Sequence, residues 1–202
     1  MELKPFIKWA GGKRQLLSQL LMHVPEKFNN YFEPFLGGGA LFLALQPKKA
    51  YLSDVNEEII NAFNVIKSNP KALMKELDKM KNNPEFFYKV RKQNPAKLSE
   101  TKRACRFIYL NKSCFNGLYR ENSKGEFNVP FANHKKVNFY DKENINNLNE
   151  YLSSSETFFS CSDYSSILEK AKKGDFIYLD SPYYPLNKTS FCSFKKLYNS
   201  SE

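Results

Sequence analysis

The first third of the chain alternates short apolar runs with segments of helical periodicity. Apolar residues recur at helical spacing over residues 16–24, and Pro25 predicts the end of this helix. Residues 31–33 and 50–53 predict short strands, and a helix is expected over residues 40–45 between them. This strand–helix–strand unit predicts a parallel sheet with a right-handed crossover. Ligands then bind at the carboxyl ends of the strands.

The pattern becomes wholly helical over residues 68–115 and returns to strands only late in the chain. A hairpin is expected over residues 117–130, with its turn around residues 122–125. Strand patterns resume at residues 157–160 and 176–179. The sequence therefore predicts an α/β fold in which a helical segment interrupts the sheet.

We divide the chain accordingly into two parts. Residues 1–56 together with residues 157–202 are expected to form a discontinuous sheet domain, and residues 57–156 an inserted subdomain.

Composition narrows the function classes. The 31 Lys and Arg residues against 21 Asp and Glu residues give a net charge of +10, which suits a polyanionic partner or simply a Lys-rich soluble protein. No apolar run is long enough to span a bilayer and no signal-peptide pattern is visible, so a reducing cytoplasm is expected. A metal site or disulfide framework is not expected from the four cysteines, which lack CxxC spacing: Cys105, Cys114, Cys161 and Cys192.

A run of three glycines, residues 37–39, follows the first predicted strand. Without side chains there, backbone N–H groups can approach a ligand beside the start of a helix. Asp54 ends the next strand, where nucleoside-binding sheets accept hydrogen bonds from ribose hydroxyls. The alternative for Asp54 is a helix N-cap ahead of Asn56. The spacing is not GxGxxG, which disfavours a nicotinamide cofactor.

Two further clusters carry possible chemistry. Lys13, in a Gly-Gly-Lys run that is not a phosphate loop, could pair with a ligand carboxylate while Trp9 packs beside it; the alternative is a helix start with a solvated lysine. The run Asp180-Ser181-Pro182-Tyr183 follows an apolar strand. An acid and a backbone carbonyl can accept both hydrogens of an exocyclic amine while an aromatic ring stacks on its base. The alternative is an ordinary strand end with a proline turn.

Residues 111–120 mix amides, aromatic rings and cations beside the expected hairpin. Amide and guanidinium groups can read base edges, and an aromatic side chain can wedge into a base stack. The alternative is a solvated corner with Arg120 in a surface ion pair.

Taken together, six motifs in the same order resemble the Dam family (D12 class) of DNA adenine-N6 methyltransferases. They run from about residue 5 to about residue 191. The resemblance implies a Rossmann-like, S-adenosylmethionine-dependent fold with an inserted target-recognition subdomain, double-stranded DNA as partner, and GATC as target sequence. The motifs are Trp9-Ala-Gly-Gly-Lys13, Glu33-Pro-Phe-Leu-Gly-Gly-Gly39, Ser53-Asp54, Phe115-Asn-Gly-Leu-Tyr-Arg120, Glu126-Phe-Asn-Val-Pro-Phe131 and Asp180-Ser-Pro-Tyr183.

The resemblance also implies roles for individual residues. Those expected to face the cofactor are Trp9, Lys13, Phe35, Gly37, Gly39, Asp54, Asp163 and Asp180. Those expected to hold a flipped adenine are Asp180, Ser181, Pro182 and Tyr183. Those expected to contact DNA are Asn116, Tyr119, Arg120, Pro130 and Asn133.

Three departures from the family pattern qualify these expectations. Ser181 replaces a proline, which keeps the backbone carbonyl but not the fixed φ. Asn133 stands where GATC-specific relatives often carry arginine. After Phe191 the tail stops resembling the family, whose members continue for roughly another 65 to 80 residues. We therefore expect a truncated or frameshifted chain with an incomplete sheet, which a second polypeptide would complete.

Two alternatives stay open beside the DNA methyltransferase. One is a catalytically weak or inactive remnant that still binds DNA or cofactor, which Ser181 and the tail favour. The other is a methyltransferase acting on RNA or on a protein amide, which Asn116 and Arg120 disfavour.

Overall fold

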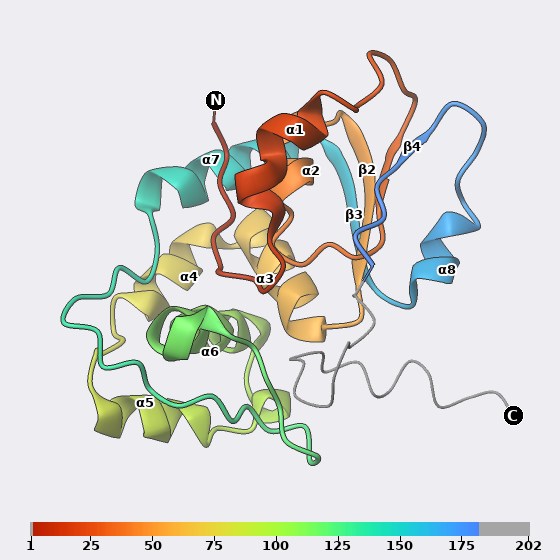
Figure 1. Cartoon of the computed structure of the whole chain (residues 1–202). Coiled ribbons are helices and arrows are strands. Elements are labelled where there is room, and N and C mark those ends of the chain that lie inside the picture. The colour runs from red at the N-terminus through yellow and green to blue at the C-terminus, as the bar shows by residue number, and fades with distance from the viewer. Residues whose placement is uncertain (1, 182–202) are drawn as a thin grey trace, which may run out of the picture.

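The computed structural model describes residues 2–181, in which a four-stranded parallel sheet is flanked by helices (Figure 1). The strands lie in the order β3-β2-β1-β4. Their bounds are β1 Tyr31–Glu33, β2 Lys49–Asp54, β3 Glu156–Cys161 and β4 Phe176–Ile177. The predicted α/β class with a parallel sheet is confirmed. Since β2 and β3 extend from one side of β1 and β4 pairs on its other side, the topology switches direction between β1 and β4.

Aromatic packing assigns the two faces of the sheet. The helices α2 (Ala40–Leu45), α3 (Glu57–Ser68) and α7 (Lys142–Ser154) cover one face, where Phe159 of β3 contacts the rings of Phe42 and Phe63. On the opposite face Phe32, Tyr51 and Phe158 form a stacked row across three strands. The parallel register Phe32↔Tyr51↔Phe158 places these rings side by side, since residues in register point to the same face.

The remaining helices form a group around α6. Helix α6 (Glu100–Ser113) packs against α3 and against α4 (Pro70–Leu77) and α5 (Pro84–Arg91), as Figure 1 shows. Its side chains from residues 104 to 111 are all buried, so α6 forms the centre of this group. The helical character expected of residues 68–115 is confirmed. The proposed division of the chain at residues 57 and 156 stays a prediction, and α3 contacts both the sheet and α6.

A long segment between α6 and α7 contains the expected hairpin turn. Antiparallel bridges join Cys114 to Phe131 and Glu121 to Phe127, and the N–H of Gly125 donates to the carbonyl of Asn122 at 3.0 Å. The turn is therefore where the sequence predicted it. The arms are single bridges rather than regular strands.

The first predicted helix is shorter than expected. A 3-10 turn (Lys13–Leu16) leads into α1 (Leu17–Leu21), and neither contains a buried residue. No side chain caps either start, and both Leu16 and Leu21 stay largely exposed. Without a cap or a buried face, the periodic leucines alone do not sustain the longer helix.

The last described strand is also shorter than predicted, ending at Ile177 rather than residue 179. The N–H of Tyr178 still donates to the carbonyl of Phe32 at 2.8 Å, so the backbone continues along β1 beyond the strand. No helix in the described part of the chain is long and apolar enough to cross a membrane.

Candidate active site

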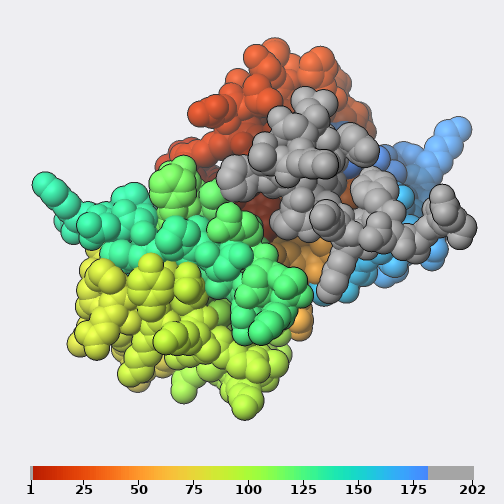
Figure 2. Space-filling view, turned by 60° about the horizontal axis from the view of Figure 1, so that its bottom comes forward, coloured from red at the N-terminus to blue at the C-terminus, as the bar shows by residue number. Residues whose placement is uncertain are grey.

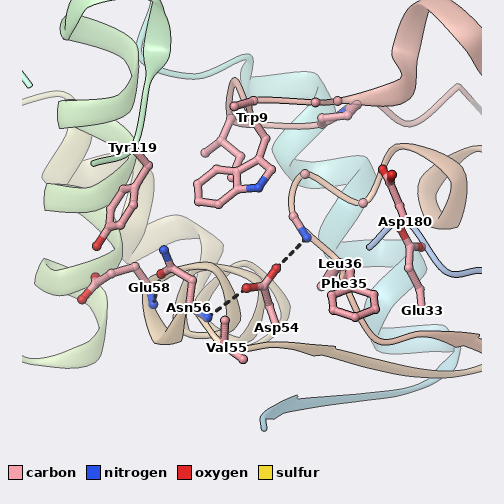
Figure 3. Close-up of a pocket in the computed structure, with 18 of the residues that line it drawn as sticks. Trp9, Glu33, Phe35, Leu36, Asp54, Val55, Asn56, Glu58, Tyr119 and Asp180 are labelled. Carbon is pink, nitrogen blue, oxygen red and sulfur yellow. Dashed lines mark hydrogen bonds between the residues drawn. The ribbon is translucent and has the colours of Figure 1, made fainter. Parts of the chain in front are cut away.

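A cavity of about 1270 Å³ opens at the carboxyl ends of β1, β2 and β4. This is where the sheet changes direction, and ligands in open α/β sheets bind at such a point. Figure 3 shows its wall, to which the N-terminal segment, the loops after β1 and β2, and the segment after α6 all contribute. The structure thus brings together side chains from distant parts of the sequence.

The glycine run packs against Trp9. Gly37 has a φ of +48° and Gly39 a φ of +66°. Residues other than glycine rarely adopt this backbone conformation. A Cβ at Gly37 would lie 2.6 Å from Cδ1 of Trp9, so the indole covers the loop directly. Glycine at position 37 is therefore required both by conformation and by the close approach of Trp9.

Asp54 holds the glycine loop in place. Its Oδ2 accepts the N–H of Gly37 at 2.8 Å, and its Oδ1 accepts the N–H of Asn56 at 2.9 Å (Figure 3). Burial raises the pKa of Asp54, which these backbone donors partly oppose. Asn56, not Asp54, is the N-cap of α3, because its side chain accepts the N–H of Glu58. The N-cap alternative for Asp54 is therefore wrong.

Two aromatic rings and an aliphatic side chain form an apolar part of the cavity wall that Asp54 also lines. The ring centroids of Phe35 and Tyr164 are 5.5 Å apart with an angle of 28° between their planes. Val55 is half exposed and lines the same cavity. Sequence reasoning named Phe35 but missed Val55 and Tyr164, although each directly follows a predicted acid. Such a wall suits a planar ring.

Asp163 lies at the rim of the cavity, at the start of α8 (Tyr164–Leu168). Its carboxylate caps this short helix by accepting the N–H and the hydroxyl of Ser165, which hold the pKa of Asp163 below its usual range. Asp163 lines the cavity, and its role toward a cofactor stays a prediction.

Lys13 and Asp180 form an ion pair across the cavity. Nζ of Lys13 lies 2.6 Å from Oδ2 of Asp180 and also donates to the carbonyl of Gly11 at 2.8 Å. The two side chains are only 15% and 24% exposed, so the pair is shielded from bulk water. The structure therefore gives Lys13 a partner within the chain, where the sequence suggested a ligand carboxylate.

The structure describes only the first two residues of the run 180–183. Asp180 and Ser181 line the cavity just beyond β4, and Ser181 is exposed. Pro182 and Tyr183, both expected to hold a flipped adenine, lie outside the described residues.

Glu33 is a cavity residue to which sequence reasoning assigned no role. It ends β1, is 3% exposed and accepts the hydroxyl of Tyr31 at 2.7 Å. Burial raises the pKa of Glu33 to about 8, and the charges of Asp180 and Asp54 add to this effect. The one available signal was an acid at the carboxyl end of a strand, directly before Pro34.

The residues expected to contact DNA lie along the segment between α6 and α7. Figure 2 shows this segment, green to teal, as a continuous surface between the N-terminal residues in red and the yellow helices. Four of its predicted contacts are exposed: Asn116, Arg120, Pro130 and Asn133.

Their surroundings differ in detail. Asn116 and Asn133 both have positive φ, at 54° and 52°. Nε of Arg120 donates to Oδ1 of Asn128 at 2.7 Å. Phe115, next to Asn116, is 53% exposed, and sequence reasoning did not single it out.

Tyr119 differs from the other predicted DNA contacts. Its ring lies 5.7 Å from that of Trp9, its hydroxyl donates to Glu121, and it lines the cavity (Figure 3). Burial raises the pKa of Tyr119. The structure therefore places Tyr119 between the exposed corner and the cavity.

The chain is similar in sequence to several known proteins. The D12 class N6 adenine-specific DNA methyltransferase profile matches residues 9–201. The chain is 43% identical to the type II methyltransferase M1.LlaDCHI of Lactococcus lactis subsp. cremoris, covering 94% of this chain and 69% of that protein. It is 41% identical to the type II methyltransferase M.MjaIII of Methanocaldococcus jannaschii, covering 97% and 75%. It is 37% identical to the DNA adenine methylase of Haemophilus influenzae, covering 95% and 68%. The chain therefore belongs to the D12 class of N6 adenine-specific DNA methyltransferases.

Proposed function

We propose that this chain transfers a methyl group from S-adenosylmethionine to N6 of adenine in duplex DNA, within GATC. Family membership supplies the reaction class. One observation carries the proposal for this chain: the Lys13–Asp180 ion pair and the Asp54-held glycine loop line a single cavity. A group that can bind an amine thus lies beside groups that can bind a nucleoside.

The residues present fit S-adenosylmethionine. Each carboxylate oxygen of Asp54 accepts one backbone N–H and has a second lone pair for a ribose hydroxyl. The wall of Phe35, Val55 and Tyr164 suits the adenine ring, with Asp163 at its rim. A volume of about 1270 Å³ exceeds that of an ordinary small-molecule pocket, which leaves room for an inserted base. The cofactor, when bound, supplies an electrophilic methyl group on its sulfonium.

The protein's own contribution is to present the amine. Asp180 accepts one amine hydrogen, and the backbone carbonyl of Ser181 accepts the other. With both hydrogens held, the nitrogen becomes pyramidal and its lone pair is less delocalised into the ring. Lys13, whose Nζ lies 2.6 Å from Oδ2 of Asp180, fixes the orientation of this carboxylate. We assign stacking on the base to Tyr183.

The DNA contacts are assigned to the exposed part of the segment after α6. Asn116 and Arg120 present an amide and a guanidinium group, which can read base edges. Phe115 is an exposed ring beside them, of the kind that inserts between base steps. Extruding the target adenine would bring it to the cavity that Tyr119 borders. The assignment of GATC rests on the sequence of this hairpin, residues 115–131.

The test is methylation of defined duplexes. The purified chain is incubated with methyl-labelled S-adenosylmethionine and with duplexes that carry GATC or a single base-pair change within it. We expect label in N6-methyladenine of the GATC duplex alone. Equal labelling of all duplexes would overturn the GATC assignment. No labelling by folded protein would overturn the proposal that this chain is active.

Replacing Gly37 with alanine is expected to weaken binding of S-adenosylhomocysteine by about tenfold or more, equal to about 1.4 kcal/mol. The added Cβ would lie 2.6 Å from the Trp9 ring and force the indole or the glycine loop to move. Calorimetric titration measures the change. Gly125→Ala is the matched control, because Gly125 also has positive φ but a Cβ there meets nothing within 4 Å. Equal losses in both variants would contradict the assignment of the effect to the contact between position 37 and Trp9.

A further inference from the structure

One buried amide joins the DNA-facing corner to the cavity wall. Asn111 on α6 is 1% exposed, and its side chain makes three hydrogen bonds to backbone groups. Oδ1 accepts the N–H of Lys8 at 2.8 Å, while Nδ2 donates to the carbonyl of Lys8 at 2.7 Å and to that of Gly117 at 2.9 Å. Both N–H groups and one lone pair of Oδ1 are therefore used to hold the segments at Lys8 and Gly117 together, and only the second lone pair of Oδ1 is left.

The two segments lead to different parts of the site. Lys8 directly precedes Trp9, whose indole covers Gly37 in the cavity wall. Gly117 directly follows Asn116 at the exposed corner. A Cβ at Gly117 would lie 2.6 Å from Cβ and Cδ of Lys8, so the corner and the N-terminal segment are in close contact.

The corner itself has a conformation that contacts must maintain. Asn116 and Gly117 have φ values of 54° and 64°, and left-handed conformation is unfavourable for a residue with a side chain. Trp9 and Tyr119 contact each other through their rings at 5.7 Å, which gives a second connection between the corner and the cavity. A shift at the corner thus has a short packed path to Trp9.

We propose that Asn111 is a positioning residue that couples DNA binding at residues 115–120 to cofactor binding in the cavity, through the backbone of Lys8 and the ring of Trp9. This inference rests on the proposed function. DNA that holds the corner in one conformation also holds Lys8, and through it the indole against the glycine loop. Because coupling is reciprocal, DNA and cofactor each raise the affinity for the other by the same factor.

Trp9 itself reports on this coupling, because it is the one tryptophan of the 202-residue sequence. Its fluorescence is followed while S-adenosylhomocysteine is titrated into the full chain, with and without a saturating GATC duplex. We expect the duplex alone to change the emission, and to tighten S-adenosylhomocysteine binding by a factor within the range of about 5 to 150 typical of coupled sites. In Asn111→Ala this factor falls toward one and the duplex no longer changes the emission.

Asn144 provides a matched control. Its side chain holds the backbone of Lys4 by the same pair of hydrogen bonds, at 3.0 and 2.9 Å, but does so from α7. Asn144→Ala therefore loosens the N-terminal segment while leaving the connection to Gly117 intact, and the coupling factor should persist. Equal coupling in Asn111→Ala and the unchanged chain, or equal loss in both variants, would overturn the inference.

A second variant tests the same contact from its other side. Gly117→Ala serves this purpose even if Asn111→Ala does not fold. It places a methyl group against Lys8 and is expected to lower the coupling factor. Unchanged coupling in Gly117→Ala would overturn the inference. Failure of the unchanged chain to bind either ligand would overturn the proposed function instead, and with it the inference. Binding of both ligands without coupling would overturn the inference alone.

Discussion

Replacing Asp180 with asparagine is expected to lower the rate constant of methyl transfer by about 100- to 1000-fold, the usual effect of removing one group aimed at the reacting centre. The amide leaves a single accepting oxygen to serve both Lys13 and the amine. Its NH2 group faces either the ammonium 2.6 Å away or the amine hydrogens, and both are unfavourable donor–donor contacts. Single-turnover labelling of a GATC duplex with saturating S-adenosylmethionine measures the rate constant directly.

Asp175→Asn is the control for this variant. Asp175 also lies beside β4, but its carboxylate accepts the N–H groups of Asn30 and Lys172, at the opposite end of the strand from Asp180. Its replacement should leave the single-turnover rate constant close to that of the unchanged chain. An Asp180→Asn variant that kept more than about a tenth of the rate would remove Asp180 from the amine-binding role.

The stability of the fold is expected to fall as the pH rises from 4.5 toward 8, because of Glu33. The folded chain keeps a proton on this buried carboxyl up to a pKa of about 8, whereas the ordinary value of 4.5 applies once the chain unfolds. Unfolding therefore releases a proton between these pH values, and the free energy of unfolding decreases by on the order of 5 kcal/mol across that window. Above pH 8 both states are ionised at this position and its contribution no longer changes.

Urea unfolding at a series of pH values from 5 to 8.5 tests this expectation in the unchanged chain and in Glu33→Gln. The amide can still accept a hydrogen bond from the hydroxyl of Tyr31 but does not ionise. The free energy of unfolding of the variant should therefore decrease less with pH, and the variant should be the more stable protein near pH 8.

Burial also raises the pKa values of Glu58 and Asp54, so part of the decrease should persist in the variant. Glu150→Gln, at an exposed position on α7, is the control. An equal pH dependence in all three proteins would contradict the assignment to Glu33.

Much of the fold could be predicted because its signals are local. The strands at residues 31–33 and 50–53 and the glycine turn each depend on a few adjacent residues. The failures have equally local causes. The leucines after Gly12 are periodic, but without a cap or a buried face they form only a 3-10 turn and a short helix.

The sequence predicted several residues that line the cavity, but not which of them contact one another. Asp54 and Asp180 could be named because they follow strands whose carboxyl ends meet at one edge of the sheet. Trp9 and Lys13 precede all the strands and could be named only from their motif. Val55 and Tyr164 were missed because their importance comes from exposure within a cavity, which no sequence pattern encodes.

The sequence by itself determined the α/β class and the order of the motifs, since these follow from residue types and short spacings. Tertiary structure alone decided which of them touch. Lys13 pairs with Asp180 across 167 positions, and Asn111 holds Lys8 across 103. It also decided that Glu33 is buried, and hence that its pKa is raised to about 8. The reason is physical: hydrogen bonding, burial and charge interaction depend on distances of a few ångströms, which only the folded arrangement of the strands and helices sets.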